Sequence, residues 1–201
     1  MNENDVEILE KETAFQGYFR IDRYRLRHRL FAGGWSEAIT REVFERGHVV
    51  GVLPYDPIED RVVLIEQFRI GAYAAGFTPW LIEIVAGIIE AGEEPEEVAR
   101  RETLEETGCS ITELLPVTTY LPGPGGGTES VKLFCGRVDA RGAGGIHGKK
   151  EEHEDIRVFP VPFTEAMARL EGGEIKNAVS IIALQWLALN HDGLRRRWGG
   201  I

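Results

Sequence analysis

The first part of the chain alternates between charged and apolar residues with a period of two. Within residues 18–31, arginines occupy positions 23, 25, 27 and 29, and Tyr24, Leu26, His28 and Leu30 fall on the opposite side. Successive side chains of a strand point to opposite faces, so this pattern predicts a strand with one charged face. The polar residues 1–14 are expected to be disordered or loosely attached, and residues 35–45 to continue as an extended or irregular segment.

Apolar runs further along the chain predict the strands of a larger sheet. Residues 47–56 and 61–68 are two such runs, and the turn-forming residues 57–60 between them predict a hairpin. Further strands are expected at 80–86, 114–121, 131–138 and 155–161. The glycine-rich residues 141–148 are expected to form a mobile loop.

The last part of the chain predicts two helices. Residues 164–170 form a short helix that ends at Gly172-Gly173, and Asn177 caps a longer helix over residues 178–189. The longer helix is apolar almost all round, which predicts burial on most of its sides. Together with an acidic helix between the strands, these elements predict an α/β fold, an α/β/α sandwich with a mixed sheet. We expect an antiparallel β segment over residues 1–48 and the main domain over residues 49–201.

The most acidic stretch lies between Gly87 and Cys109. Its glutamates occupy positions 90, 93, 94, 96, 97, 102, 105 and 106. At about 100° per residue, Glu102, Glu105 and Glu106 share one helix face. Like charges at this spacing destabilise a helix by roughly 0.2–0.5 kcal/mol per pair. Such a face is either solvated or holds a cation, and hard cations such as Mg²⁺ prefer carboxylate oxygens.

The spacing within this stretch resembles the signature of the Nudix family, G-x5-E-x7-R-E-U-x-E-E-x-G-U, in which U is bulky and apolar. Every fixed position is filled, by Gly87, Glu93, Arg101, Glu102, Glu105, Glu106 and Gly108. Two apolar positions depart mildly, because Thr103 and Cys109 stand where an aliphatic residue is usual. The resemblance favours a cation site over a solvated face.

The same stretch carries local signals for a loop, a helix and a cap. Pro95 suits the first helical turn, where a backbone N–H has no partner inside the helix. Gly108 suits a left-handed C-terminal cap. Gly87 and Gly92 allow the preceding loop to bend back, and we expect Glu93 to meet Arg101.

Composition excludes several kinds of partner. The 201 residues carry a formal charge of −10, whereas nucleic-acid binding needs a basic face. The chain has no apolar run long enough to span a membrane and no signal-peptide pattern, so we expect neither a nucleic-acid nor a membrane partner. Cys109 and Cys135 give no disulfide framework, and we expect both to be buried in a protein of the cytoplasm.

The resemblance to the Nudix family implies roles for individual residues. The metal ligands would be Glu102, Glu105, Glu106, Glu154 and the backbone carbonyl of Ala86, holding two or three Mg²⁺ ions, with Mn²⁺ or Zn²⁺ possible. Gly87, Glu93 and Arg101 would support the signature, and Glu152 would be the catalytic base. The residues alone do not choose among Glu151, Glu152, Glu154 and Asp155 as the base.

The rest of the chain is similar to the bacterial ADP-ribose pyrophosphatases of this family, over residues 15–198. The resemblance lies in the segments 41–47, 67–70, 145–148 and 152–158 and in ALQWL near the C-terminal end. It implies hydrolysis of ADP-ribose to AMP and ribose 5-phosphate by a homodimer that exchanges its N-terminal sheet. The residues that would contact the substrate are Tyr18, Phe19, Arg41, Glu42, Arg46, Arg69, Ile88, Gly123, Gly125 and Glu129, of which Tyr18, Phe19 and Arg41 would serve the other subunit's site.

Two other functions compete with this one. Another nucleoside-diphosphate-sugar hydrolase, such as one that cuts GDP-mannose, would share the signature and the base loop and differ only in base and sugar contacts. A non-catalytic Nudix nucleotide sensor would have lost signature carboxylates, whereas Glu102, Glu105, Glu106 and Glu152 are all present.

Overall fold

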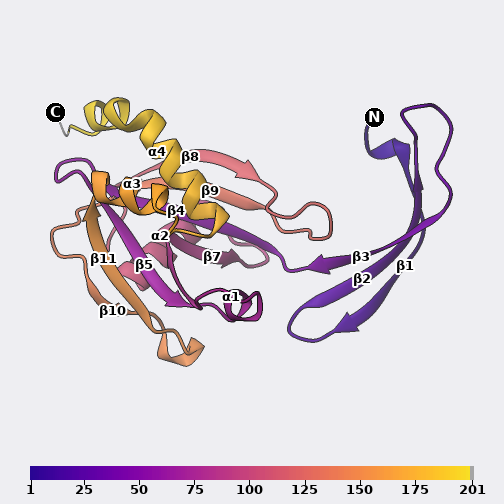
Figure 1. Cartoon of the computed structure of the whole chain (residues 1–201), viewed down its shortest axis with the longest axis horizontal. Helices are drawn as coiled ribbons and strands as arrows, with labels where there is room; N and C mark the ends of the chain where they lie inside the picture. Colours follow the sequence, from indigo (N-terminus) through magenta and orange to yellow (C-terminus); the bar gives the residue numbers. More distant parts are fainter. Residues whose placement is uncertain (200–201) are drawn as a thin grey trace. The chain divides into compact units, whose positions relative to one another are not determined.

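The computed structural model describes residues 1–199, which fold as two compact units (Figure 1). The first unit comprises Met1–His48 and Leu121–Ser130, and the second comprises the rest of the described chain. Residues 121–130 thus belong with the N-terminal segment, whereas the predicted division at residue 48 places them in the main domain. The division into domains stays a prediction.

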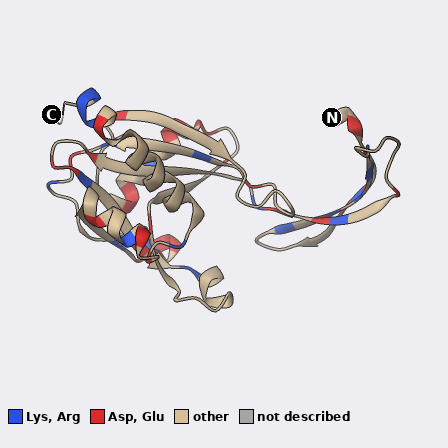
Figure 2. Cartoon of the chain, turned by 45° about the horizontal axis from the view of Figure 1, so that its top comes forward, with Lys and Arg blue, Asp and Glu red and all other residues tan. Residues whose placement is uncertain are grey.

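The first unit is a three-stranded antiparallel sheet in the order β1 (Val6–Gln16), β2 (Arg20–His28) and β3 (Ile39–Glu45), preceded by a short 3-10 turn, η1 (Glu3–Asp5). The prediction of disorder for residues 1–14 is wrong, because β1 pairs with β2 along almost its whole length. Figure 2 shows lysines and arginines in blue along these strands. Arg23 of β2 lies 2.8 Å from Glu12 of β1 and 3.0 Å from Glu42 of β3, so opposite charges face one another across the strands.

The second unit is built on an eight-stranded mixed sheet. Its strand order is β10 (Gly145–His147), β11 (Ile156–Pro162), β5 (Arg61–Phe68), β4 (His48–Asp56), β9 (Val131–Arg137) and β8 (Glu113–Tyr120). In addition β6 (Trp80–Glu83) pairs with β5, and β7 (Val85–Ile89) pairs with β4. The β4–β9 pair is parallel, and β4 and β5 form the predicted antiparallel hairpin.

Helices cover both faces of this sheet, as predicted. On one face α2 (Pro95–Thr107) packs Val98 and Ala99 against Val50 and Val52 of β4. On the other face α3 (Phe163–Glu171) and α4 (Ala178–Arg197) pack against residues of β4 and β9 such as Leu53, Tyr55, Leu133 and Cys135. The period-two alternation of β4 therefore divides its side chains between two cores.

Several details differ from the predictions. The single strand expected at 80–86 is two strands, β6 and β7, and a short helix, α1 (Ile70–Ala74), precedes them. The expected loop at 141–148 contains β10 and leads into a 3-10 turn, η2 (Lys150–Glu152). Helix α4 continues past its predicted end to Arg197, and within residues 178–189 Ala183, Leu184 and Leu187 are buried as expected whereas Leu189 is 87% exposed. In the described chain no helix is both long and apolar enough to cross a bilayer.

Candidate active site

Helix α2 carries the candidate site and lies against strand β7. The helix starts at Pro95 and ends at Gly108, which has a φ of 71°, as predicted for a left-handed cap. Its contact with the strand is close, because a Cβ built on Gly87 would lie 2.2 Å from Cγ of Glu102. Only glycine fits at this point, which gives the first residue of the signature a steric reason.

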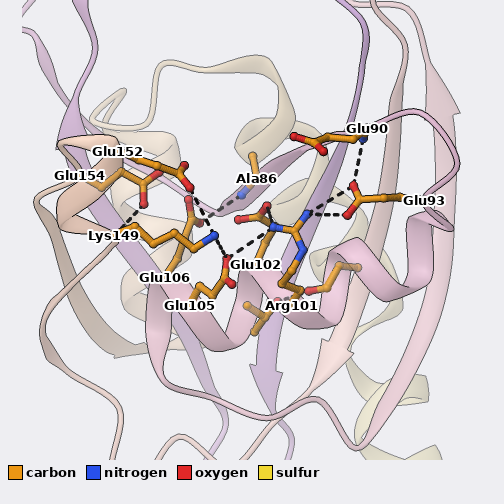
Figure 3. A network of polar contacts seen from close by, with 12 residues as sticks. Ala86, Glu90, Glu93, Arg101, Glu102, Glu105, Glu106, Lys149, Glu152 and Glu154 are labelled. Carbon is orange, nitrogen blue, oxygen red and sulfur yellow. Dashed lines mark hydrogen bonds and ion pairs between the residues drawn. The ribbon is translucent and has the colours of Figure 1, made fainter.

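Arg101 holds the loop before the helix to the helix itself (Figure 3). Its Nη2 lies 3.3 Å from Oε1 of Glu93, which confirms that these two residues meet. Its Nη1 lies 2.7 Å from Oε1 of Glu102 and 3.5 Å from Oε2 of Glu105. Glu93 in turn accepts a hydrogen bond of 2.9 Å from the backbone N–H of Glu90 and so closes the loop.

Glu106 is the most deeply buried carboxylate of the site, with 3% of its surface exposed. The backbone N–H of Ala86 on β7 donates to its Oε2 at 3.3 Å. Burial raises the pKa of Glu106 well above its usual range, and the negative charges of Glu102 and Glu154 raise it further. A carboxylate in this environment is stabilised by a cation, or by a proton where no cation is bound.

A loop after β10 brings three further groups to the same helix face. Lys149 extends from this loop with its Nζ 2.9 Å from Oε2 of Glu105 and 3.3 Å from Oε1 of Glu152 (Figure 3). The backbone N–H of Lys149 donates to Oε2 of Glu154 at 3.0 Å. The loop bends at Gly148, with a φ of 97°, and at His153, with a φ of 57°. The loop that carries the predicted base therefore lies beside the acidic face of α2.

Arg69 is held in place by an acidic residue of a neighbouring strand. Arg69 follows β5 and contacts Glu83 of β6 through both Nε, at 2.9 Å, and Nη2, at 2.8 Å. Gln67 donates to the same oxygen of Glu83 at 3.3 Å. The positive charge of Arg69 offsets a small part of the rise in the pKa of Glu106. Ile88, on β7, is 43% exposed.

The donor atoms suit a hard divalent cation. Glu102, Glu105 and Glu106 of α2 and Glu154 of the loop present carboxylate oxygens, the ligands that Mg²⁺ prefers. Within residues 1–199, however, no three His, Cys, Asp or Glu side chains are grouped closely enough to hold a metal ion. In this arrangement Arg101 pairs with Glu102 and Glu105, and Lys149 pairs with Glu105.

The other predicted substrate residues belong to the first unit. Arg46 pairs with Glu129 at 3.1 Å, and Glu42 pairs with Arg23. Phe19 packs edge to face against Phe44, with ring centroids 4.9 Å apart, and Tyr18 is 87% exposed. Arg41 donates to the backbone carbonyl of Thr40 at 2.8 Å. Gly123 and Gly125 lie in the segment 121–130.

Two residues that contact the site were not predicted from the sequence. Glu83 interrupts the apolar run LIEIVAG, and an acidic residue in a buried strand is a signal for a charged partner, here Arg69. Lys149 lies two residues before the mainly acidic segment 151–155, but its two partners come from different elements. Only the fold brings Glu105 next to it.

Comparison with known proteins gives a consistent set of relatives. The NUDIX domain model matches residues 45–184. An ADP-ribose pyrophosphatase of Escherichia coli (strain K12) is 52% identical over 195 residues, which cover 97% of this chain and 93% of that protein. An ADP-ribose pyrophosphatase of Haemophilus influenzae is 43% identical over 200 residues, which cover 98% of this chain and 92% of that protein.

More distant similarity extends to a second substrate name and to a solved structure. A GDP-mannose pyrophosphatase of Escherichia coli O1:K1 / APEC is 34% identical over 156 residues, which cover 75% of this chain and 78% of that protein. The crystal structure of an ADP compounds hydrolase matches with a TM-score of 0.73 at 20% identity, over 98% of this chain and 97% of that one. At that identity the match concerns the fold alone.

Proposed function

This chain belongs to the Nudix family, and we propose that it hydrolyses the diphosphate bond of ADP-ribose to AMP and ribose 5-phosphate. Family membership rests on the NUDIX match over residues 45–184, and it makes the chain a hydrolase that acts on a diphosphate bond. One observation carries the choice of substrate: ADP-ribose pyrophosphatases are 52% and 43% identical over nearly the whole chain, whereas the GDP-mannose pyrophosphatase is 34% identical over 75% of it.

The residues around α2 divide the chemistry among them. Glu102, Glu105, Glu106, Glu154 and the carbonyl of Ala86 would hold two or three divalent ions, with Mg²⁺ as the expected metal. A divalent ion held by these residues would supply positive charge to the diphosphate and to the leaving oxygen. Gly87, Glu93 and Arg101 keep the loop and the helix in place.

Glu152 is the proposed base that removes a proton from the attacking water. Its side chain is 58% exposed, on the 3-10 turn η2, so water can reach the carboxylate. The ligand carboxylates of α2 cannot serve as the base while they hold a cation, which leaves the loop to supply it. Arg69, fixed by Glu83, would donate to phosphate oxygens beside them.

The first unit would contribute the nucleoside contacts. Tyr18 and Phe19 offer flat apolar faces for the adenine, and Arg41 and Arg46 offer guanidinium groups for the phosphates. Glu42, Glu129, Gly123 and Gly125 would complete the substrate contacts of this unit, and Ile88 those of the second.

We further propose a homodimer with exchanged N-terminal sheets, located in the cytoplasm. The three-stranded sheet has two edge strands, β1 and β3; Phe15 on β1 is 59% exposed, and Phe31, between β2 and β3, is 98% exposed. Cys109 and Cys135 are buried and form no disulfide, which fits a reducing compartment. Light scattering coupled to gel filtration would give the mass of the assembly. A monomer at micromolar concentration would contradict the dimer.

The substrate is tested by incubating the protein with ADP-ribose and with GDP-mannose side by side, with Mg²⁺ and with EDTA. We expect AMP and ribose 5-phosphate from ADP-ribose, only with Mg²⁺, and faster than GMP from GDP-mannose. Faster cleavage of GDP-mannose would keep the chemistry and overturn the substrate. Cleavage of neither, with binding of ADP-ribose, would favour a nucleotide sensor.

A further inference from the structure

The ammonium group of Lys149 lies between the acidic helix and the proposed base. We propose that Lys149 is an internal cation that competes with the divalent metal: its ammonium holds Glu105 and Glu152 together and is displaced when the metal binds. This inference rests on the proposed function, because it assumes that Glu105 is a metal ligand and Glu152 the base.

The geometry of Lys149 supports a bridging role. Its Nζ lies 2.9 Å from Oε2 of Glu105 on α2 and 3.3 Å from Oε1 of Glu152 on η2. Figure 3 shows the side chain extended along the face between these two carboxylates. One flexible ammonium thus links the element that carries the proposed ligands to the turn that carries the proposed base.

The base loop is otherwise held mainly by its own backbone. The N–H groups of Glu152 and Glu154 donate to the carbonyl of Lys149, both at 3.1 Å, and the N–H of His153 donates to the carbonyl of Lys150 at 3.1 Å. These bonds shape the turn but do not attach it to α2. The ion pair from Lys149 to Glu105 supplies such an attachment.

The ion pair between Lys149 and Glu105 occupies an oxygen atom of a proposed metal ligand. Oε2 of Glu105 receives both Nζ of Lys149 at 2.9 Å and Nη1 of Arg101 at 3.5 Å. A divalent ion bound to that oxygen would repel an ammonium at this distance, since like charges a few ångströms apart oppose each other even near the surface. Metal and ammonium therefore compete for Glu105, and removal of the ammonium favours the metal.

Displacement of the ammonium also has a consequence for Glu152. Once Lys149 leaves, the carboxylate of Glu152 loses a cation that lies against one of its oxygens. Lys149 is thus a positioning residue that links the turn of the proposed base to the helix of the proposed ligands.

The experiment measures Mn²⁺ binding by electron paramagnetic resonance, without nucleotide, on the full-length wild-type protein and on K149M, K149R and K150M. Lys150 is the matched control, because it is the adjacent lysine of the same turn and forms no ion pair within residues 1–199. We expect K149M to bind Mn²⁺ about two- to fivefold more tightly than K150M, the upper part of the range that an exposed ion pair supports. K149R, which keeps a cation, should stay within about twofold of the wild type.

A second readout follows the base loop directly. In metal-free protein, hydrogen exchange at the amides of residues 152–154 should be faster in K149M than in K150M, because the attachment to α2 is lost. Equal Mn²⁺ affinity in K149M and K150M would overturn the inference and leave the proposed function standing. If wild type and all variants fail to bind Mn²⁺, the metal centre itself is refuted and the inference with it.

Discussion

Gly87 and Glu102 are packed so closely that no side chain fits between them. A Cβ on Gly87 would lie 2.2 Å from Cγ, 2.4 Å from Cδ and 2.6 Å from Oε1 of Glu102. Arg101 holds the same carboxylate from the other direction at 2.7 Å. Strand β7 therefore determines where a proposed metal ligand points.

The first prediction concerns this contact. In G87A the methyl group must displace the side chain of Glu102, and we expect a loss of about 1–3 kcal/mol in the free energy of unfolding, as for other overpacked sites. Mn²⁺ affinity should fall with it. Urea unfolding and Mn²⁺ titration measure the two effects. G71A is the control, because a Cβ at Gly71 would meet nothing within 4 Å; equal stability of the two variants would contradict the steric argument.

The second prediction separates function from stability at Glu106. In E106Q we expect turnover of ADP-ribose to fall by at least about 100-fold, since one charged ligand is lost. In EDTA at neutral pH the variant should be at least as stable as the wild type. The reason is that burial raises the pKa of Glu106, so ionisation of this group opposes folding. The cost begins above the ordinary pKa of 4.5 and is complete above the raised one, whereas the neutral amide does not carry it.

The exposed glutamate of the same helix, Glu96, provides the control for this variant. E96Q should retain turnover within about twofold and change the unfolding free energy by only a few tenths of a kcal/mol. If E106Q instead strongly destabilises the metal-free protein, the negative charge of Glu106 stabilises the fold, which would contradict the prediction.

Local signals in the sequence predicted the parts of the fold that depend on neighbouring residues. Pro95 starts α2, Gly108 ends it, and Asn177 caps α4 by accepting a hydrogen bond of 2.9 Å from the N–H of Ser180. Each of these effects acts within a few residues. The two cysteines are buried as expected: Cys135 lies in the apolar strand β9, and Cys109, directly after the cap of α2, packs with Val63 and Ile65 of β5.

Features that depend on distant partners were not predictable in the same way. Strand β1 looks polar and unstructured alone, yet its glutamates face the arginines of β2, as in the pair of Glu12 and Arg23. In the site, fixed spacing predicted that Glu93 meets Arg101, eight residues apart. The pair of Glu105 and Lys149 lies 44 residues apart in the chain and depends on the pairing of β10 with β11.

The third prediction tests the base. In E152Q we expect kcat to fall by about 100- to 10,000-fold, the range for removal of a general base, while Mn²⁺ affinity changes much less. The neighbouring Glu151 serves as the control, and E151Q should keep kcat within about twofold. An unchanged rate in E152Q together with a loss in E151Q would assign the base to the other carboxylate of η2.

The fourth prediction concerns Asp60, far in sequence from the proposed ligands. Its Oδ1 accepts hydrogen bonds of 2.7 Å from Oη of Tyr55 and lies 2.7 Å from Nε2 of His191 on α4. Burial acts to raise the pKa of Asp60, but the contacts with His191 and Tyr55 outweigh it and lower the pKa below its ordinary value of 3.8. The folded protein therefore binds fewer protons at this site than the unfolded chain between the two pKa values.

The sign of the pH dependence follows from that difference. Unfolding takes up a proton in this window, so the stability that Asp60 contributes is fully present above about pH 3.8 and is lost as the pH falls through the lowered pKa. We expect D60N to be less stable than the wild type by on the order of 1 kcal/mol at pH 6, with the gap closing toward pH 3. Asn tolerates the φ of 54° at this position, so the backbone gives no separate penalty.

Urea unfolding of wild type, D60N and D192N between pH 3 and pH 6 measures this difference in stability. Asp192 is the control because it is 80% exposed beside the same histidine. A gap that stays constant with pH would mean that D60N acts through packing and not through the charge of Asp60.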